Sequence, residues 1–228
     1  MSETSETQEK QPNRGSARRR AMMDAAWQLL LEKGFSGVTL NDVIARSGGS
    51  RTTLYAAFGG KDGLLAAVMT EQCSEFSEEL HISLESDLPP RDTLMRFAKK
   101  LATEILTEEA IRFTQILFTE GQHFRPMIDN FIAHGPQSTR TRLARYLRRQ
   151  TEAGFLAVED PDCSAEMFIS MVVGGWQEQM EKVHNPRSHS TKQIDQRVRT
   201  AVDIFLSGMA SINYRETLGQ TRAGFLPT

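Results

Sequence analysis

The sequence predicts an all-α protein, in which a small three-helix unit precedes a larger helical unit. Three observations lead to this prediction. Apolar residues recur at i, i+3 and i+4 through most of the 228 residues, as on one face of a helix. Gly and Pro residues stand between these stretches, where helices commonly start and stop. No stretch alternates between apolar and polar residues as a half-buried strand does.

The chain divides into a tail and two domains. Residues 1–15 are mostly polar without periodicity, and we expect them to form a disordered tail. Residues 16–61 are expected to form the first domain and residues 62–215 the second. The first domain opens with an apolar stripe that predicts a helix from about residue 17 to residue 33, and Gly34 ends it.

The stretch from Thr39 to Lys61 predicts two short helices joined by a tight turn. Thr39 is a candidate cap of the first helix, with Asp42 three residues later as in a capping box. Gly48 ends that helix, and Ser50 is a candidate cap of the next. Helix, short turn and helix is the helix-turn-helix arrangement, whose second helix enters the major groove of DNA.

Polar side chains crowd the first turns of the second helix. Arg is the commonest bidentate reader of guanine, and Thr bonds bases or touches a thymine methyl group. We therefore interpret these side chains as DNA contacts; a solvated helix with a Thr-rich start is the alternative. The expected DNA-binding set is Thr39, Arg46, Ser50, Arg51, Thr52, Thr53, Tyr55 and Lys61.

The distribution of charge agrees with a DNA-binding first domain. The whole chain has a net charge of −2, but residues 14–61 hold eight Lys or Arg against three acids. A basic head on an acidic body suits specific DNA binding without general adhesion to polyanions. No apolar run reaches the roughly 18 residues of a membrane span, and the N-terminus is not a signal peptide. We therefore expect a cytoplasmic protein without a membrane partner.

The second domain reads as a series of helices separated by Gly and Pro. Gly135-Pro136 is expected to kink or break the helix that contains it, because Pro lacks the helical donor. The expected helices span residues 61–85, a stretch opening at Pro89-Pro90, and residues 107–121, 123–134, 137–153, 161–183 and 190–213.

Large apolar side chains are abundant in the second domain. Most are expected to be core, but their mixture with a few polar residues suits a pocket for a small apolar ligand. The expected ligand-binding set is Phe97, Phe113, Gln115, Met127, Phe131, Phe168, Met171 and Trp176. No metal-ligand spacing, nucleophile elbow or phosphate-binding loop occurs, so no cofactor, metal or catalytic residue is expected.

Residues 17–69 resemble the DNA-binding domain of the TetR-type transcriptional repressors. Gly49 departs from the family pattern, which usually has a small apolar residue there, and Ala56 and Ala57 replace bulkier or polar residues. The stretches that carry the resemblance are Ala25-Ala26, Leu29-Leu30, Glu32-Lys33-Gly34-Phe35, Thr39, Val43-Ile44-Ala45, Gly48, Thr53-Leu54-Tyr55, Phe58, Lys61 and Leu64-Leu65.

Residues 112–162 resemble the AefR-like C-terminal domain of some TetR-type regulators. The resemblance to TetR-type proteins implies a homodimer formed by the helices at 161–183 and 190–213, in which Gly174-Gly175 would allow close approach of a partner helix. Ordinary packing of both apolar stripes within one chain is the alternative.

The function expected from the sequence is that of a dimeric repressor, which binds a palindromic operator in double-stranded DNA and is released by a small apolar ligand. One alternative is a DNA-binding regulator with no small-molecule effector. Another is a helical enzyme with a vestigial head.

Overall fold

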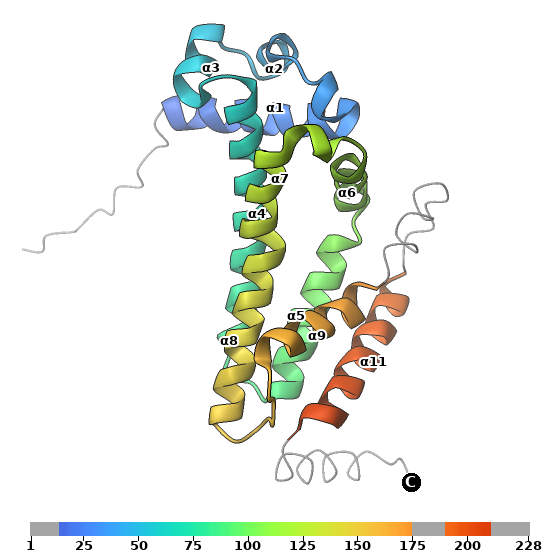
Figure 1. Ribbon diagram of the computed structural model, residues 1–228. Coiled ribbons are helices and arrows are strands. Elements are labelled where there is room, and N and C mark those ends of the chain that lie inside the picture. The colour runs from blue at the N-terminus through green and yellow to red at the C-terminus, as the bar shows by residue number, and fades with distance from the viewer. Residues whose placement is uncertain (1–13, 175–189, 211–228) are drawn as a thin grey trace, which may run out of the picture. The chain divides into compact units, whose positions relative to one another are not determined.

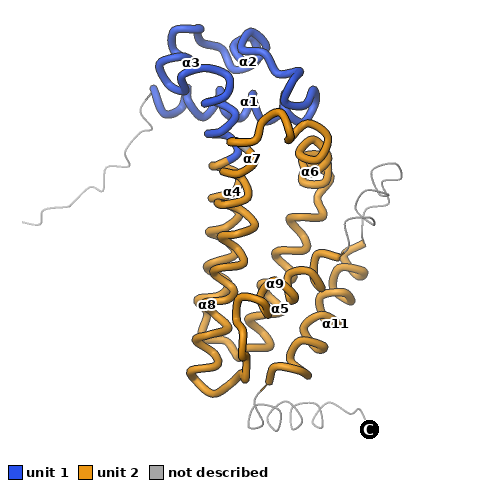
Figure 2. The backbone as a smooth tube through the Cα atoms, in the orientation of Figure 1, with its two compact units in different colours: residues 1–69 blue, residues 70–228 orange. Residues whose placement is uncertain are grey.

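The computed structural model describes residues 14–174 and 190–210, and helices are the regular elements of these ranges (Figure 1). The predicted all-α fold is confirmed. The chain forms two compact units, residues 1–69 and residues 70–228 (Figure 2). The division falls inside α4 (Lys61–Leu84), whereas the sequence placed the domain boundary at the start of this helix. None of the described helices is long and apolar enough to cross a membrane.

Three helices form most of the first unit: α1 (Arg14–Gly37), α2 (Leu40–Ser47) and α3 (Arg51–Phe58). Gly34 interrupts α1, as predicted, because its φ of 72° lies in the left-handed region that Gly tolerates. A last helical turn then continues to Gly37. The apolar stripes of the three helices meet in one small core that includes Met22, Leu29, Leu30, Phe35, Val38, Val43 and Leu54.

The core of the second unit lies among its longer helices. α5 (Pro90–Ile105) packs against both α9 (Pro161–Val173) and α11 (Thr191–Met209), and α8 (Ser138–Glu152) packs against α9. Pro90 occupies the first turn of α5, where its missing N–H breaks no helical bond. The buried side chains of this core include Leu80, Leu94, Phe97, Leu101, Leu143, Tyr146, Leu147, Phe168, Val202 and Phe205.

A chain of shorter elements connects α5 to α8: α6 (Glu108–Glu120), the 3₁₀ turn η1 (Gly121–Phe124), α7 (Arg125–Ile132) and the π-helical turn η2 (Ala133–Gln137). The irregularity expected at Gly135-Pro136 takes the form of η2, whose wider turn accommodates a proline that cannot donate. Gly135 lies against the Cys73 side chain of α4. Burial raises the pKa of this thiol to about 12, so it stays protonated and donates to the Phe131 carbonyl oxygen at 3.9 Å.

Two predicted helix ends were wrong. The helix predicted to reach Val183 ends at Val173, because Gly174 takes φ 82° and ψ 176°. The Arg197 guanidinium of α11 lies where a side chain at position 174 would be. Gly174 is therefore packed against a residue of the same protomer. The helix predicted to reach residue 213 ends at Met209, because Ala210 is extended and pairs with Leu156.

Candidate functional site

The two helix caps predicted in the first unit are confirmed. The Asp42 N–H donates to Thr39 Oγ1 at 3.1 Å, and the Thr53 N–H donates to Ser50 Oγ at 3.1 Å. Each cap satisfies an N–H that would otherwise have no partner within its helix. The starts of α2 and α3 are therefore held by side chains three residues away.

The turn between α2 and α3 depends on two consecutive glycines. Gly48 and Gly49 have φ values of 71° and 115°, which side chains of L residues rarely adopt. A Cβ on Gly49 would also lie 2.8 Å from the Met22 Cε atom. A side chain at this position would therefore strain the backbone and require the end of the Met22 side chain to shift.

The outward face of α3 carries the side chains predicted to read DNA. Arg51, Thr52 and Thr53 are exposed, and Tyr55 keeps 53% of its surface accessible. Leu54, between them in the sequence, is fully buried and fixes the helix to the core of its unit. Because the Leu54 face of α3 is buried in the core, the polar side chains of this helix lie on its exposed face.

Arg51 is held by a residue that the sequence analysis missed. Its Nε and Nη2 atoms donate to Asn41 Oδ1 of α2 at 3.3 and 3.1 Å. The Asn41 amide restricts the rotation of the guanidinium but does not neutralise its charge. No local pattern indicates this contact, because ten residues and a turn separate the two side chains.

Two of the predicted phosphate contacts have partners within their own unit. Arg46 donates from Nη1 and Nη2 to the two Glu32 carboxylate oxygens at 2.7 and 2.8 Å, and this hydrogen bonding raises the Arg46 pKa. Lys61 Nζ donates to the Ser36 carbonyl oxygen at 3.4 Å. A phosphate would therefore compete with a carboxylate at Arg46 and only with a neutral carbonyl at Lys61.

The predicted ligand-binding residues of the second unit divide into two groups. Phe97 and Phe168 have no exposed surface, and the Phe168 ring packs edge-on against Phe205 with centroids 4.9 Å apart. The Phe113 ring, mostly buried, meets the half-buried Phe131 ring edge-on, with centroids 5.2 Å apart.

The other members of the set are placed in part. Gln115 and Met171 are half-buried on α6 and α9, and Met127 belongs to α7. Trp176 lies outside the described residues.

Two open clefts on the second unit have other linings. The first, of about 650 Å³, lies between α4 and the η2–α8 segment. The second, of about 850 Å³, lies beside the loop before α5 and is lined by residues 85–90, 149, 150 and 153–155. None of the predicted ligand-binding residues whose side chains the structure describes lines either cleft, so these side chains and the two clefts are separate features.

Two sequence families match the chain. Residues 22–68 match the family described as bacterial regulatory proteins, tetR family. Residues 92–208 match the C-terminal domain of the AefR-like transcriptional repressors, a longer stretch than residues 112–162 on which that resemblance was recognised. The second match alone covers half of the chain.

Individual proteins agree with these matches. The chain is similar to the HTH-type transcriptional regulator YvkB of Bacillus subtilis, with 28% identity over 67% of this chain and 78% of YvkB. A TetR-family regulator structure from Mesorhizobium loti superposes with a TM-score of 0.77 at 18% identity, covering 87% of this chain and 99% of that one. The structure of the flavonoid-responsive regulator FrrA has a TM-score of 0.68 at 27% identity, covering 85% and 97%.

Proposed function

Because this chain belongs to the TetR family, whose members are DNA-binding transcriptional regulators and not enzymes, we propose that it represses transcription as a homodimer on a palindromic operator. A small apolar ligand releases it from that operator. Binding of chromosomal DNA makes the cytoplasm its place of action.

The polar outward face of α3 is the observation that carries this proposal. Arg51, Thr52, Thr53 and Tyr55 reach the base edges, because they occupy the first turns of the helix that enters the major groove. Arg51 is restrained by an uncharged amide, so its positive charge and its bidentate geometry stay available to a guanine.

The remaining DNA-binding set contacts the phosphate backbone. Thr39 and Ser50 are exposed caps, and their hydroxyl groups reach phosphate oxygens in exchange for their contacts with Asp42 and Thr53. Lys61 adds charge at the start of α4, and Arg46 contributes once phosphate displaces Glu32. These contacts orient α3 and carry no sequence information of their own.

Selection of bound sequences from random double-stranded DNA tests this part of the proposal. We expect an inverted repeat whose half-sites lie about 34–36 Å apart, or a multiple of that distance, as two recognition helices require. Enrichment of a single half-site without symmetry would contradict a dimer on a palindrome. Absence of any enriched sequence would contradict sequence-specific repression.

The dimer forms through the last two described helices, α9 and α11. Support comes from Met167 on α9 and Ile204 on α11, each of which leaves 59% of its surface exposed. Exposed large apolar side chains are typical of the centre of a protein interface. The apolar stripe of α11 that includes Val202 is already buried within its own unit, so the dimer uses the other face of this helix.

The ligand binds in the second unit near the Phe113 and Phe131 rings. The 27% identity with the flavonoid-responsive FrrA favours an apolar aromatic compound. The ligand acts by binding the DNA-incompetent state better; a hundredfold preference is worth about 2.7 kcal/mol. Since residues of both units belong to α4, this helix carries the change.

A thermal-shift screen of flavonoids and other apolar aromatic compounds, followed by operator release, tests the ligand. We expect Phe131→Trp to abolish release while leaving operator affinity unchanged, because the larger ring fills space that the ligand needs. If no compound of the screen releases DNA, the regulator without a small-molecule effector is the better description.

A further inference from the structure

The arginines of α8 differ in one respect from one another. Four of the five have an acidic partner within 3.5 Å, and Arg145 has none among the described residues. The pairs are Arg140–Glu166 at 3.0 Å, Arg142–Glu78 at 3.5 Å, Arg148–Asp162 at 3.4 Å and Arg149–Glu85 at 3.4 Å.

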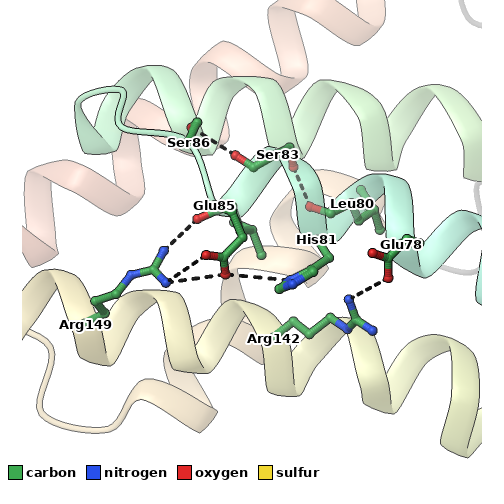
Figure 3. Close-up of polar contacts among 9 residues, drawn as sticks. Glu78, Leu80, His81, Ser83, Glu85, Ser86, Arg142 and Arg149 are labelled. Carbon is green, nitrogen blue, oxygen red and sulfur yellow. Dashed lines mark hydrogen bonds and ion pairs between the residues drawn. The ribbon is translucent and has the colours of Figure 1, made fainter. Parts of the chain in front are cut away.

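The two pairs between α4 and α8 set a regular register (Figure 3). Glu78 with Arg142 and Glu85 with Arg149 are both 64 residues apart, so the two helices run parallel and the pairs recur after seven residues. The same separation matches Arg145 with His81. A histidine therefore stands at the position where the series would have an acid.

Arg145 and His81 both line the cleft of about 650 Å³ between α4 and the η2–α8 segment. The His81 ring lies near Glu85, with 3.8 Å between Nδ1 and Oε1. The Glu78–Arg142 pair also lines the cleft, together with three uncharged polar groups: the Gln137 amide and the Ser138 and Thr141 hydroxyls. The cleft thus offers one unpaired guanidinium fork together with several neutral hydrogen-bonding groups.

We propose that this cleft binds a small organic monocarboxylate, whose carboxylate pairs with Arg145 and supplies the acid that α4 lacks at His81. The planar guanidinium matches a carboxylate in a bidentate geometry. Arg142, Arg145 and Arg149 carry one positive charge more than Glu78 and Glu85, so a monoanion neutralises the group. A dianion such as phosphate would be repelled by the two flanking carboxylates.

The site extends the proposed function, because it gives the second unit a site for a carboxylate in addition to the site proposed for an apolar ligand. Only the step from binding to DNA release rests on that function. Binding itself is measured without DNA, so its failure and the failure of operator release are separate results.

Calorimetric titration of the full chain with acetate and with benzoate tests the site, with acetamide and benzamide as uncharged controls of the same shape. We expect both carboxylates to bind and neither amide to bind. Arg145→Ala should weaken carboxylate binding about tenfold or more, the usual loss for a charge-assisted pair. Arg148→Ala, on the same helix but outside the cleft, should leave it unchanged.

The variant His81→Glu provides a second, independent measurement. It adds the acid within the chain, so it should raise the unfolding temperature of the free protein and abolish carboxylate binding. Wild-type affinity in Arg145→Ala or in His81→Glu would overturn the proposal. So would tighter binding of inorganic phosphate than of either carboxylate, or no carboxylate binding at concentrations up to tens of millimolar.

Discussion

Two exposed arginines, Arg51 and Arg149, have different partners. Arg51 of α3 donates to the neutral Asn41 amide, whereas Arg149 of α8 pairs with the Glu85 carboxylate and also donates to the Leu84 carbonyl oxygen at 2.7 Å. A neutral partner orients a guanidinium and leaves its charge to attract an external anion. An acidic partner neutralises that charge beforehand, so an external phosphate gains little by binding there.

The two units also expose different apolar groups. The first unit exposes the Tyr55 ring beside the polar side chains of α3, a combination that suits DNA. The second unit exposes the aliphatic side chains of Met167 and Ile204 on its last two described helices. This difference in surface chemistry supports the proposal that the first unit binds nucleic acid and the second binds another protein surface.

The largest expected effect separates the two faces of α11. Val202→Glu places a charge in the core of the second unit and should cost about 3–5 kcal/mol, as an uncompensated buried charge does. Ile204→Glu, two residues away and exposed, should change protomer stability by less than about 0.5 kcal/mol but yield monomers. Urea denaturation and sedimentation distinguish these outcomes. A stable dimer of Ile204→Glu would remove this face of α11 from the interface.

A smaller effect is expected on the surface of α3. Arg51→Ala should cost about 1–3 kcal/mol of operator affinity and relax the preference at one base position. Asn41→Ala should cost about 1 kcal/mol or less, because it removes only the restraint on Arg51. Titrations on operator and scrambled DNA measure both. Equal losses on the two DNAs for Arg51→Ala would contradict base reading.

Two arginines of α8 provide a matched pair for stability. Arg149→Ala should cost about 1–2 kcal/mol, because it removes a carbonyl hydrogen bond in addition to an ion pair. Arg142→Ala removes only a 3.5 Å ion pair with an exposed acid and should cost about 0.5 kcal/mol or less. Urea denaturation of both variants makes the comparison. Equal costs would show that the carbonyl contact adds nothing.

Releasing Arg46 from its acidic partner tests whether pairing withholds charge from DNA. Glu32→Gln removes the carboxylate and should tighten binding to any DNA sequence. The slope of log K against the logarithm of the salt concentration should become steeper by up to about 0.9, the value for one added phosphate contact. Glu109→Gln, an acid of α6 in the second unit, serves as the control. An unchanged salt dependence in Glu32→Gln would mean that Arg46 does not contact phosphate.

The smallest expected effect is on the stability of the protein at acid pH. The hydrogen bond from Lys33 Nζ at 2.9 Å, followed by those from Thr39, lowers the pKa of the Asp42 carboxyl. A lowered pKa in the folded state stabilises the protein above the unfolded value of about 3.9, and this stability is lost as pH falls through the folded value. Asp42→Asn should therefore lose less stability on acidification than the wild type. Urea midpoints at neutral and acid pH measure the difference.

Local sequence determined the helix starts and the tight turn of the first unit. Thr39 and Ser50 bond N–H groups three residues away, and Gly48 and Gly49 adopt dihedrals that few other residues tolerate. Such interactions lie within a few residues of chain, so the sequence alone predicts them. The all-α fold and the exposed polar turn of α3 followed from the same local patterns.

The tertiary structure decided what each face meets. The apolar stripe of α11 that includes Val202 could pack within its own protomer or against a second one. The folded unit shows that it is buried within its own protomer. The end of α9 at Gly174 leaves room for the Arg197 side chain, which comes from 23 residues later in the sequence. Asn41 beside Arg51 and His81 opposite Arg145 join different helices in the same way. Helical periodicity states which residues share a face, whereas the neighbour of that face depends on how distant segments pack.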